Sequence, residues 1–114
     1  RVRKPSVALC DSGQIDLVMT TGGTGLGPRD VTPEATRHVI DLEVPGMAEA
    51  MRMETLKNTP FAMLSRSVVG VRNGCVILNL PGSPSGVRET LDVALRAMPH
   101  ALEMVKGWRT HTEA

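Results

Sequence analysis

The stretch Thr20–Asp30, TTGGTGLGPRD, directly follows the apolar run that ends at Met19. A short apolar run bounded by glycines is typical of a buried strand, so residues 15–20 are predicted to form one. Four glycines occupy the six positions 22–27, which is more backbone freedom than a simple turn needs. Glycines allow backbone N–H groups to approach an anion. The stretch therefore predicts a strand followed by a phosphate-binding loop, with a purely structural turn as the alternative.

Asp30 closes this loop, and two interpretations of its carboxylate remain open. A carboxylate beside a phosphate is unfavourable unless it holds a cation, which would make Asp30 a metal-supporting residue. Aspartate also commonly caps a turn before a helix. The loop matches neither the GxGxxG pattern nor a phosphate loop that ends in Gly-Lys-Ser/Thr, so no standard nucleotide motif decides the question.

Two helices are predicted after the loop. Thr32 is expected to cap the first helix and Pro33 to occupy its first position, and the helix should run to about Leu42. Pro45 limits how far it can continue. Residues 46–56 are rich in methionine and predict the second helix, with an apolar face formed by Met47, Ala50 and Met51.

The second half of the chain predicts a hairpin and a last helix. Residues 68–72 and 75–80 flank Asn73-Gly74, the dipeptide that most strongly favours a tight hairpin turn. After the sequence PGSP at 81–84, apolar residues recur at helical spacing, and Pro99 is expected to bend or restart this helix before it ends near Gly107. Ligands bind at the carboxyl ends of strands in open α/β sheets, which is where loops 20–30 and 81–84 are expected.

The amino-acid composition argues against several other classes of function. The 114 residues, 41% of them hydrophobic, fit a single domain over 1–114. A net charge of +1, with one Phe, one Trp and no Tyr, gives no indication of nucleic-acid binding. No apolar run is long enough to span a membrane. Cys10 and Cys75 lack metal-site spacing and are interpreted as structural thiols of a reduced, cytoplasmic protein.

Several sequence blocks, which follow one another along the chain, resemble those of a known family. TTGGTG, RDVTPEAT, VPGMAEAMR, TPFAMLSR and ILNLPGSP resemble the molybdopterin adenylyltransferase family, which includes the G domain of gephyrin, over about Leu9 to Gly107. The resemblance implies a three-layer α/β molybdopterin-binding fold with a mostly parallel sheet and a hairpin near the C-terminal half. It also implies a cytoplasmic homotrimer that uses Mg²⁺ and ATP to adenylylate molybdopterin and releases pyrophosphate.

The resemblance also assigns site residues. Asp30 matches the catalytic acidic residue that supports Mg²⁺. Ser65 and Arg66 match a block near the pterin, with a structural hydroxyl as the alternative for Ser65. The remaining matched positions belong to the two ligand-binding loops: Gly22, Gly23, Thr24, Gly25, Pro81, Gly82 and Ser83.

Two alternative functions are compatible with the same blocks. A molybdenum-insertion or competence-damage-type domain shares the strand and the TTGG loop, although RDVTPEAT favours the adenylyltransferase. A non-catalytic trimer that binds molybdopterin or organises partners is the second alternative. Release of pyrophosphate from ATP distinguishes the enzyme from both.

The first 14 residues predict that a segment of the family's fold is missing near the start of this sequence. Residues 1–8, RVRKPSVA, resemble the lead-in to a strand, whereas residues 9–14, LCDSGQ, resemble the end of a helix that Gly13 stops. The family carries a strand–helix unit of a few dozen residues here. We expect this unit to be missing between Ala8 and Leu9; a true deletion, or one helix over both stretches despite Pro5, is the alternative.

Overall fold

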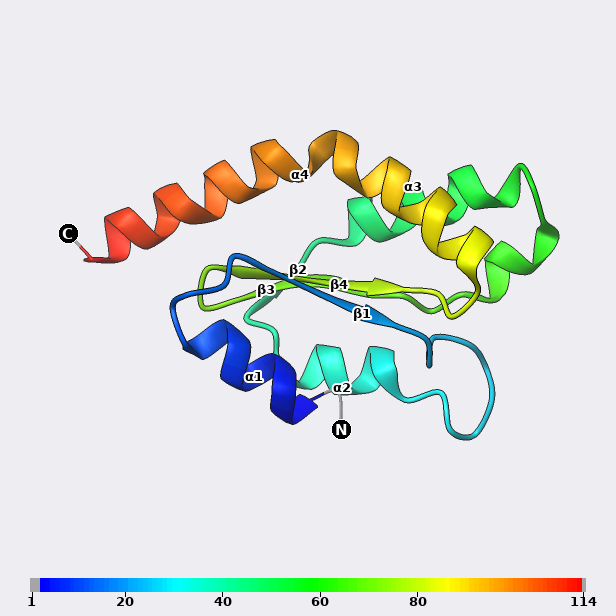
Figure 1. Ribbon diagram of the computed structural model, residues 1–114, viewed down its shortest axis with the longest axis horizontal. Coiled ribbons are helices and arrows are strands. Elements are labelled where there is room, and N and C mark those ends of the chain that lie inside the picture. The colour runs from blue at the N-terminus through cyan, green and yellow to red at the C-terminus, as the bar shows by residue number, and fades with distance from the viewer. Residues whose placement is uncertain (1–2, 114) are drawn as a thin grey trace.

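The computed structural model describes the backbone of residues 3–113 and the side chains of residues 5–107, and it forms three layers (Figure 1). A four-stranded sheet is the middle layer. Helices α1 (Arg3–Asp11) and α2 (Thr32–Val39) cover one face, while α3 (Pro45–Leu56) and α4 (Pro84–Glu113) cover the other. The predicted three-layer α/β fold is therefore confirmed.

The sheet is mixed rather than mostly parallel. Its order is β1-β4-β3-β2, in which β1 (Leu17–Thr21) runs parallel to β4 (Cys75–Leu80). The other two pairs are antiparallel: β3 (Val69–Arg72) with β4, and β2 (Leu42–Glu43) with β3. The β3–β4 pair is antiparallel because a two-residue turn reverses the chain, whereas β2 and β3 are joined through α3 and η1.

The hairpin is confirmed where Asn73-Gly74 predicted it. Both residues have positive φ, 50° and 75°, so the turn twists in the sense that suits the two strands. Arg72 pairs with Cys75 at the turn, and β4 is buried along its whole length. A strand with helices on both faces is expected to be apolar throughout, as this one is except at Asn79.

The first predicted helix ends earlier than expected, at Val39 instead of about Leu42. The next residues are drawn into the sheet, because the N–H groups of Asp41 and Val44 donate to carbonyls of β3 at 2.7 Å each. Thr32 is not a cap: Val31 holds the cap position without a side-chain hydrogen bond, and Thr32 is buried in the first turn.

The second predicted helix is confirmed as α3, followed by a short 3-10 turn η1 (Pro60–Leu64). Met51 faces the core as expected, but Ala48 is buried where Ala50 was predicted. Helix α4 passes through Pro99 without a restart and extends beyond Gly107, which does not adopt the positive φ that would end a helix.

Residues 3–11 form one helix, so the strand-like interpretation of the described residues before Leu9 is wrong. The helical hydrogen bonding continues across Ala8–Leu9, since the N–H of Ser12 donates to the carbonyl of Ala8 at 3.1 Å. Gly13, at φ 73°, follows the end of this helix as predicted. That a strand–helix unit of the family is missing beside Ala8 stays a prediction.

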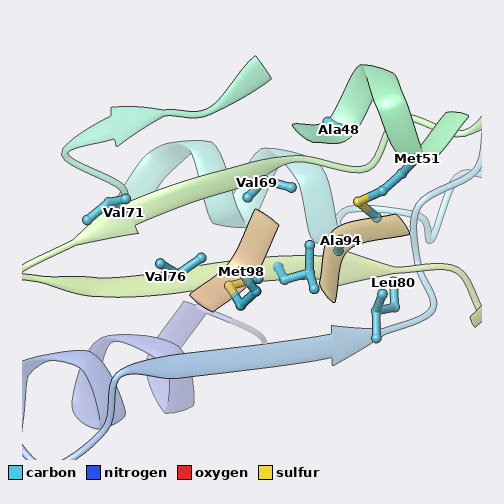
Figure 2. Close-up of a cluster of buried hydrophobic side chains, with 9 residues drawn as sticks. Ala48, Met51, Val69, Val71, Val76, Leu80, Ala94 and Met98 are labelled. Atoms are coloured by element: carbon cyan, nitrogen blue, oxygen red, sulfur yellow. The ribbon is translucent and has the colours of Figure 1, made fainter. Parts of the chain in front are cut away.

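Each face of the sheet carries its own apolar cluster. The larger one joins α3 and α4 to the sheet through Met51, Val69, Ala94 and Met98 (Figure 2). The smaller one, under α1 and α2, brings Cys10 and Cys75 together among aliphatic side chains. Among the described helices, none combines the length and apolar character that crossing a membrane requires.

Candidate functional site

The two predicted loops meet at the carboxyl ends of the parallel strands β1 and β4. The N–H of Gly22 donates to the carbonyl of Leu80 at 2.9 Å. A Cβ built on Gly82 would lie 3.5 Å from the Cα of Gly22, so the two backbones are almost in contact. The structure therefore brings the glycine-rich loop and the PGSP loop into one site, as the sequence predicted.

The glycines of the first loop make room for the protein's own side chains. Gly23 has φ +71°, and a Cβ there would lie 2.3 Å from Oγ1 of Thr32, whose N–H donates to the carbonyl of Gly23. A Cβ on Gly25 or Gly27 would lie 3.0 or 2.9 Å from Oδ2 of Asp30. The glycines thus allow Thr32 and Asp30 to sit against the loop backbone, a reason that the sequence pattern alone did not indicate.

Asp30 caps a turn and still keeps one oxygen available. Its Oδ2 accepts a 2.8 Å hydrogen bond from the N–H of Gly27, and its own N–H donates to the carbonyl of Gly27 at 3.0 Å. The turn-capping interpretation therefore holds. Within the described part of the chain, Oδ1 of Asp30 has no hydrogen-bond partner. The carboxylate can accordingly cap the turn and offer its second oxygen to a cation.

Arg66, which the family resemblance matched to a block near the pterin, holds the glycine-rich loop in place. Its backbone N–H donates to the carbonyl of Thr24 at 2.8 Å, its Nε to the carbonyl of Gly25 at 2.8 Å, and its Nη2 to the carbonyl of Asp30 at 2.6 Å. Its Nη1 pairs with the carboxylate of Glu34, and this hydrogen bond lowers the pKa of Glu34. The one sequence signal for Arg66 was its place in the block TPFAMLSR.

Two predicted site residues make internal hydrogen bonds. The Ser65 hydroxyl donates to Oγ of Ser67 at 3.1 Å, which agrees with the structural interpretation of Ser65. The Oγ of Ser83 accepts from the N–H of Gly86 at 3.1 Å and so caps the start of α4. Pro81 packs beside that cap, since a Cβ on Gly86 would lie 2.9 Å from its Cγ.

Polar groups without partners gather at the first loop. The hydroxyl of Thr24, a residue only 6% exposed, has no hydrogen-bond partner among the residues that the structure describes, and the same is true of Thr32 at 4%. Buried polar groups are nearly always hydrogen-bonded, so orphaned hydroxyls call for a ligand or a water. Thr24 and the loop backbone therefore fit a ligand rich in acceptor oxygens, such as a phosphate.

The donor set fits a cation that arrives with its ligand. The described residues contain no cluster of three or more His, Cys, Asp or Glu side chains. Magnesium is commonly held by one or two carboxylates together with substrate phosphates, which is compatible with Oδ1 of Asp30 as the protein's contribution.

An apolar hollow of about 320 Å³ lies elsewhere, between α4 and strands β2–β4. None of the predicted site residues lines it. Its walls are side chains such as Met47, Val69 and Val105, which offer no groups for phosphate chemistry. The site at the two loops is therefore distinct from this hollow.

Comparison with known proteins identifies the family to which the chain is similar. A family model described as "Probable molybdopterin binding domain" matches residues 5–100. A molybdopterin adenylyltransferase from Helicobacter pylori strain J99 is 46% identical over 106 residues, which cover 93% of this chain and 60% of the relative. The chain thus spans about three-fifths of that relative's length.

Solved structures agree with the fold over nearly the whole chain. The molybdopterin biosynthesis Mog protein of Mycobacterium ulcerans superimposes with a TM-score of 0.89 at 44% identity, covering 93% of this chain and 69% of that one. The molybdopterin biosynthesis enzyme MoaB of Thermus thermophilus gives a TM-score of 0.86 at 55% identity, covering 93% of this chain and 67% of that one.

Proposed function

Because the chain belongs to the family of molybdopterin binding domains, we propose that it adenylylates molybdopterin with Mg-ATP and releases pyrophosphate. The observation that carries the proposal is the pair of loops joined at Gly22 and Gly82, with the orphaned Thr24 hydroxyl and the available Oδ1 of Asp30 beside them. The activity named for the Helicobacter pylori relative supports the same reaction.

The chemistry requires little more than positioning and charge neutralisation. An oxygen of the molybdopterin phosphate attacks the α-phosphorus of ATP, a new P–O bond forms, and the bond to the leaving pyrophosphate breaks. Backbone N–H groups of the glycine-rich loop hold non-bridging oxygens in place. When bound, Mg²⁺ supplies positive charge to the leaving group, and Oδ1 of Asp30 would hold it. The nucleophile belongs to the substrate, which explains why the site needs no activated Ser or Cys.

Purified protein with molybdopterin, ATP and Mg²⁺ tests the proposal by the release of pyrophosphate. We expect Asp30→Asn to lower kcat by about 100-fold or more, because it removes a charge needed for turnover, while the amide oxygen still caps the turn. Asp41→Asn is a matched control, since Oδ2 of Asp41 accepts from the N–H of Asn73 at 2.7 Å far from the loops. Wild-type turnover by Asp30→Asn at saturating Mg-ATP contradicts the assigned role.

We further propose that the protein acts as a homotrimer in the cytoplasm. The family resemblance supports the trimer, and large apolar side chains that are exposed on α3 and η1 give it a contact surface: Met53, Leu56, Phe61, Met63 and Leu64. Two free cysteines support a reducing compartment. Light scattering at micromolar concentration should give three times the 12.2 kDa protomer mass; a monomer contradicts the trimer.

A further inference from the structure

Arg66 donates hydrogen bonds to three carbonyl groups of the glycine-rich loop, so these three carbonyls all face Arg66. The carbonyl of Thr24 receives its backbone N–H, while those of Gly25 and Asp30 receive its guanidinium at 2.8 and 2.6 Å. Glu34, in the first turn of α2, holds the guanidinium from the other side through Nη1. One residue thus joins both ends of the loop to the following helix.

The hydrogen bonds from Arg66 to three loop carbonyls also fix the direction of the N–H groups that follow those carbonyls. In a planar trans peptide, the carbonyl of one residue and the N–H of the next point in opposite directions. The N–H groups of Gly25, Leu26 and Val31 therefore point away from Arg66. In the described residues none of these three N–H groups has a hydrogen-bond partner, and Leu26 and Val31 are exposed. Successive free N–H groups on one side of a loop form an anion-binding surface.

We propose that Arg66 is a positioning residue that presents the N–H groups of Gly25, Leu26 and Val31 to the phosphates of the nucleotide. The inference rests on the proposed function, because that function supplies the phosphates. Arg66 itself contacts the loop and Glu34 and acts on the ligand through the backbone. A lysine at this position has one compact charge and no planar fork, so it cannot hold both carbonyls and the carboxylate in this way.

Amide NMR with inorganic pyrophosphate as the probe tests the proposal without any turnover. In the wild type we expect pyrophosphate to shift the signals of Gly25, Leu26 and Val31. Arg66→Met removes the guanidinium and leaves the backbone bond to Thr24, so the response of Leu26 and Val31 should be lost while that of Gly25 is retained in part. Affinity for pyrophosphate should fall at least about tenfold, and Arg66→Lys should restore little of it.

Arg72→Met is the matched control. The Arg72 side chain is buried to a similar extent, since 27% of it is exposed against 33% for Arg66. Its guanidinium donates to the carbonyl of Val39 and to the carboxylate of Asp11, near the hairpin turn. This variant should bind pyrophosphate within twofold of wild type even if it is less stable. If Arg66→Met does not fold, Glu34→Gln removes the ionic anchor alone and should weaken binding two- to fivefold.

The outcomes separate this inference from the proposed function. Wild-type protein that binds pyrophosphate at these three amides but transfers no adenylyl group overturns the function, and loss of that binding in Arg66→Met still supports the role of Arg66. Wild-type affinity in Arg66→Met or in Glu34→Gln, shifts confined to other amides, or no pyrophosphate binding by the wild type overturns the role of Arg66.

Discussion

Replacing Gly23 by alanine should destabilise the protein far more than the same change one residue earlier. Both positions have positive φ, +71° at Gly23 and +83° at Gly22. The surroundings differ, because a Cβ at Gly23 would lie 2.3 Å from Oγ1 of Thr32, whereas a Cβ at Gly22 would have its nearest neighbour, the Cα of Gly82, at 4.0 Å. Gly22→Ala therefore isolates the backbone strain, and Gly23→Ala adds a steric clash to it.

The magnitudes follow from these two contributions. A non-glycine residue in the left-handed region costs about 1–2 kcal/mol. Overpacking a buried contact costs about 1–3 kcal/mol more, so Gly23→Ala should lower the free energy of unfolding by about 2–5 kcal/mol. The whole free energy of unfolding of a small domain is about 5–15 kcal/mol, so this loss would be a large part of it. Gly46→Ala, in the first turn of α3 with open space around its Cβ, should be neutral or slightly stabilising and serves as the control.

Urea denaturation followed by circular dichroism measures the four free energies of a double-mutant cycle. Thr32→Ala removes the atom that clashes, so Gly23→Ala should cost only the backbone strain in that background, and the two changes should couple by about 1–3 kcal/mol. Equal losses for Gly22→Ala and Gly23→Ala, or additive costs in the double variant, refute the clash with Thr32 as the reason for the glycine.

Three shorter predictions concern charge, the second loop and the thiols. The pKa of Glu34 is lowered by the hydrogen bond from Arg66, so the stability it contributes is complete above its ordinary pKa of 4.5 and is lost as the pH falls through the lowered value. The difference in unfolding free energy between wild type and Glu34→Gln should be present at pH 7 and vanish in acid; a constant difference is the contrary result. Gly82→Val should weaken nucleotide binding with little loss of stability, because its φ is not positive and its methyls fill space between the loops; unchanged affinity in calorimetry argues against the second loop. Cys10 and Cys75 are both 0% exposed, and burial raises the pKa of Cys10, so iodoacetamide should label neither in the native protein and both in urea, as mass spectrometry would show.

The hairpin and the two loops were predictable because their signals are local. Asn73-Gly74 selects its own turn conformation, and a run of glycines after an apolar strand marks the end of that strand wherever it lies in the sheet. The early end of α2 was not predictable, because it depends on hydrogen bonds from Asp41 to Val71 and from Val44 to Val69, which lie 30 and 25 residues further along the chain. Propensity within the segment favoured a longer helix, and the sheet overrode it.

The sequence predicted where the candidate site lies, but it did not predict the contacts that hold the loops of the site in place. Arg66 contacts residues that precede it by 32 to 42 positions, and no spacing rule relates it to Gly25 or Asp30. The reason for Gly23 was hidden in the same way, because only the folded chain places Thr32 against it. The candidate binding residues were predicted from the pattern, whereas the residues that hold them in place could be found only from the structure.

The parallel pairing of β1 with β4 has a consequence for how the protein folds. The hydrogen bond between Asn79 and Thr20 joins residues 59 apart in the chain, whereas β3 and β4 are joined by two residues. Closing the longer loop costs more chain entropy before any contact repays it, so the hairpin should form early and β1 should dock late. Since the glycine-rich loop begins where β1 ends, a refolding chain should form the β3–β4 hairpin before this loop reaches its native position beside the second loop.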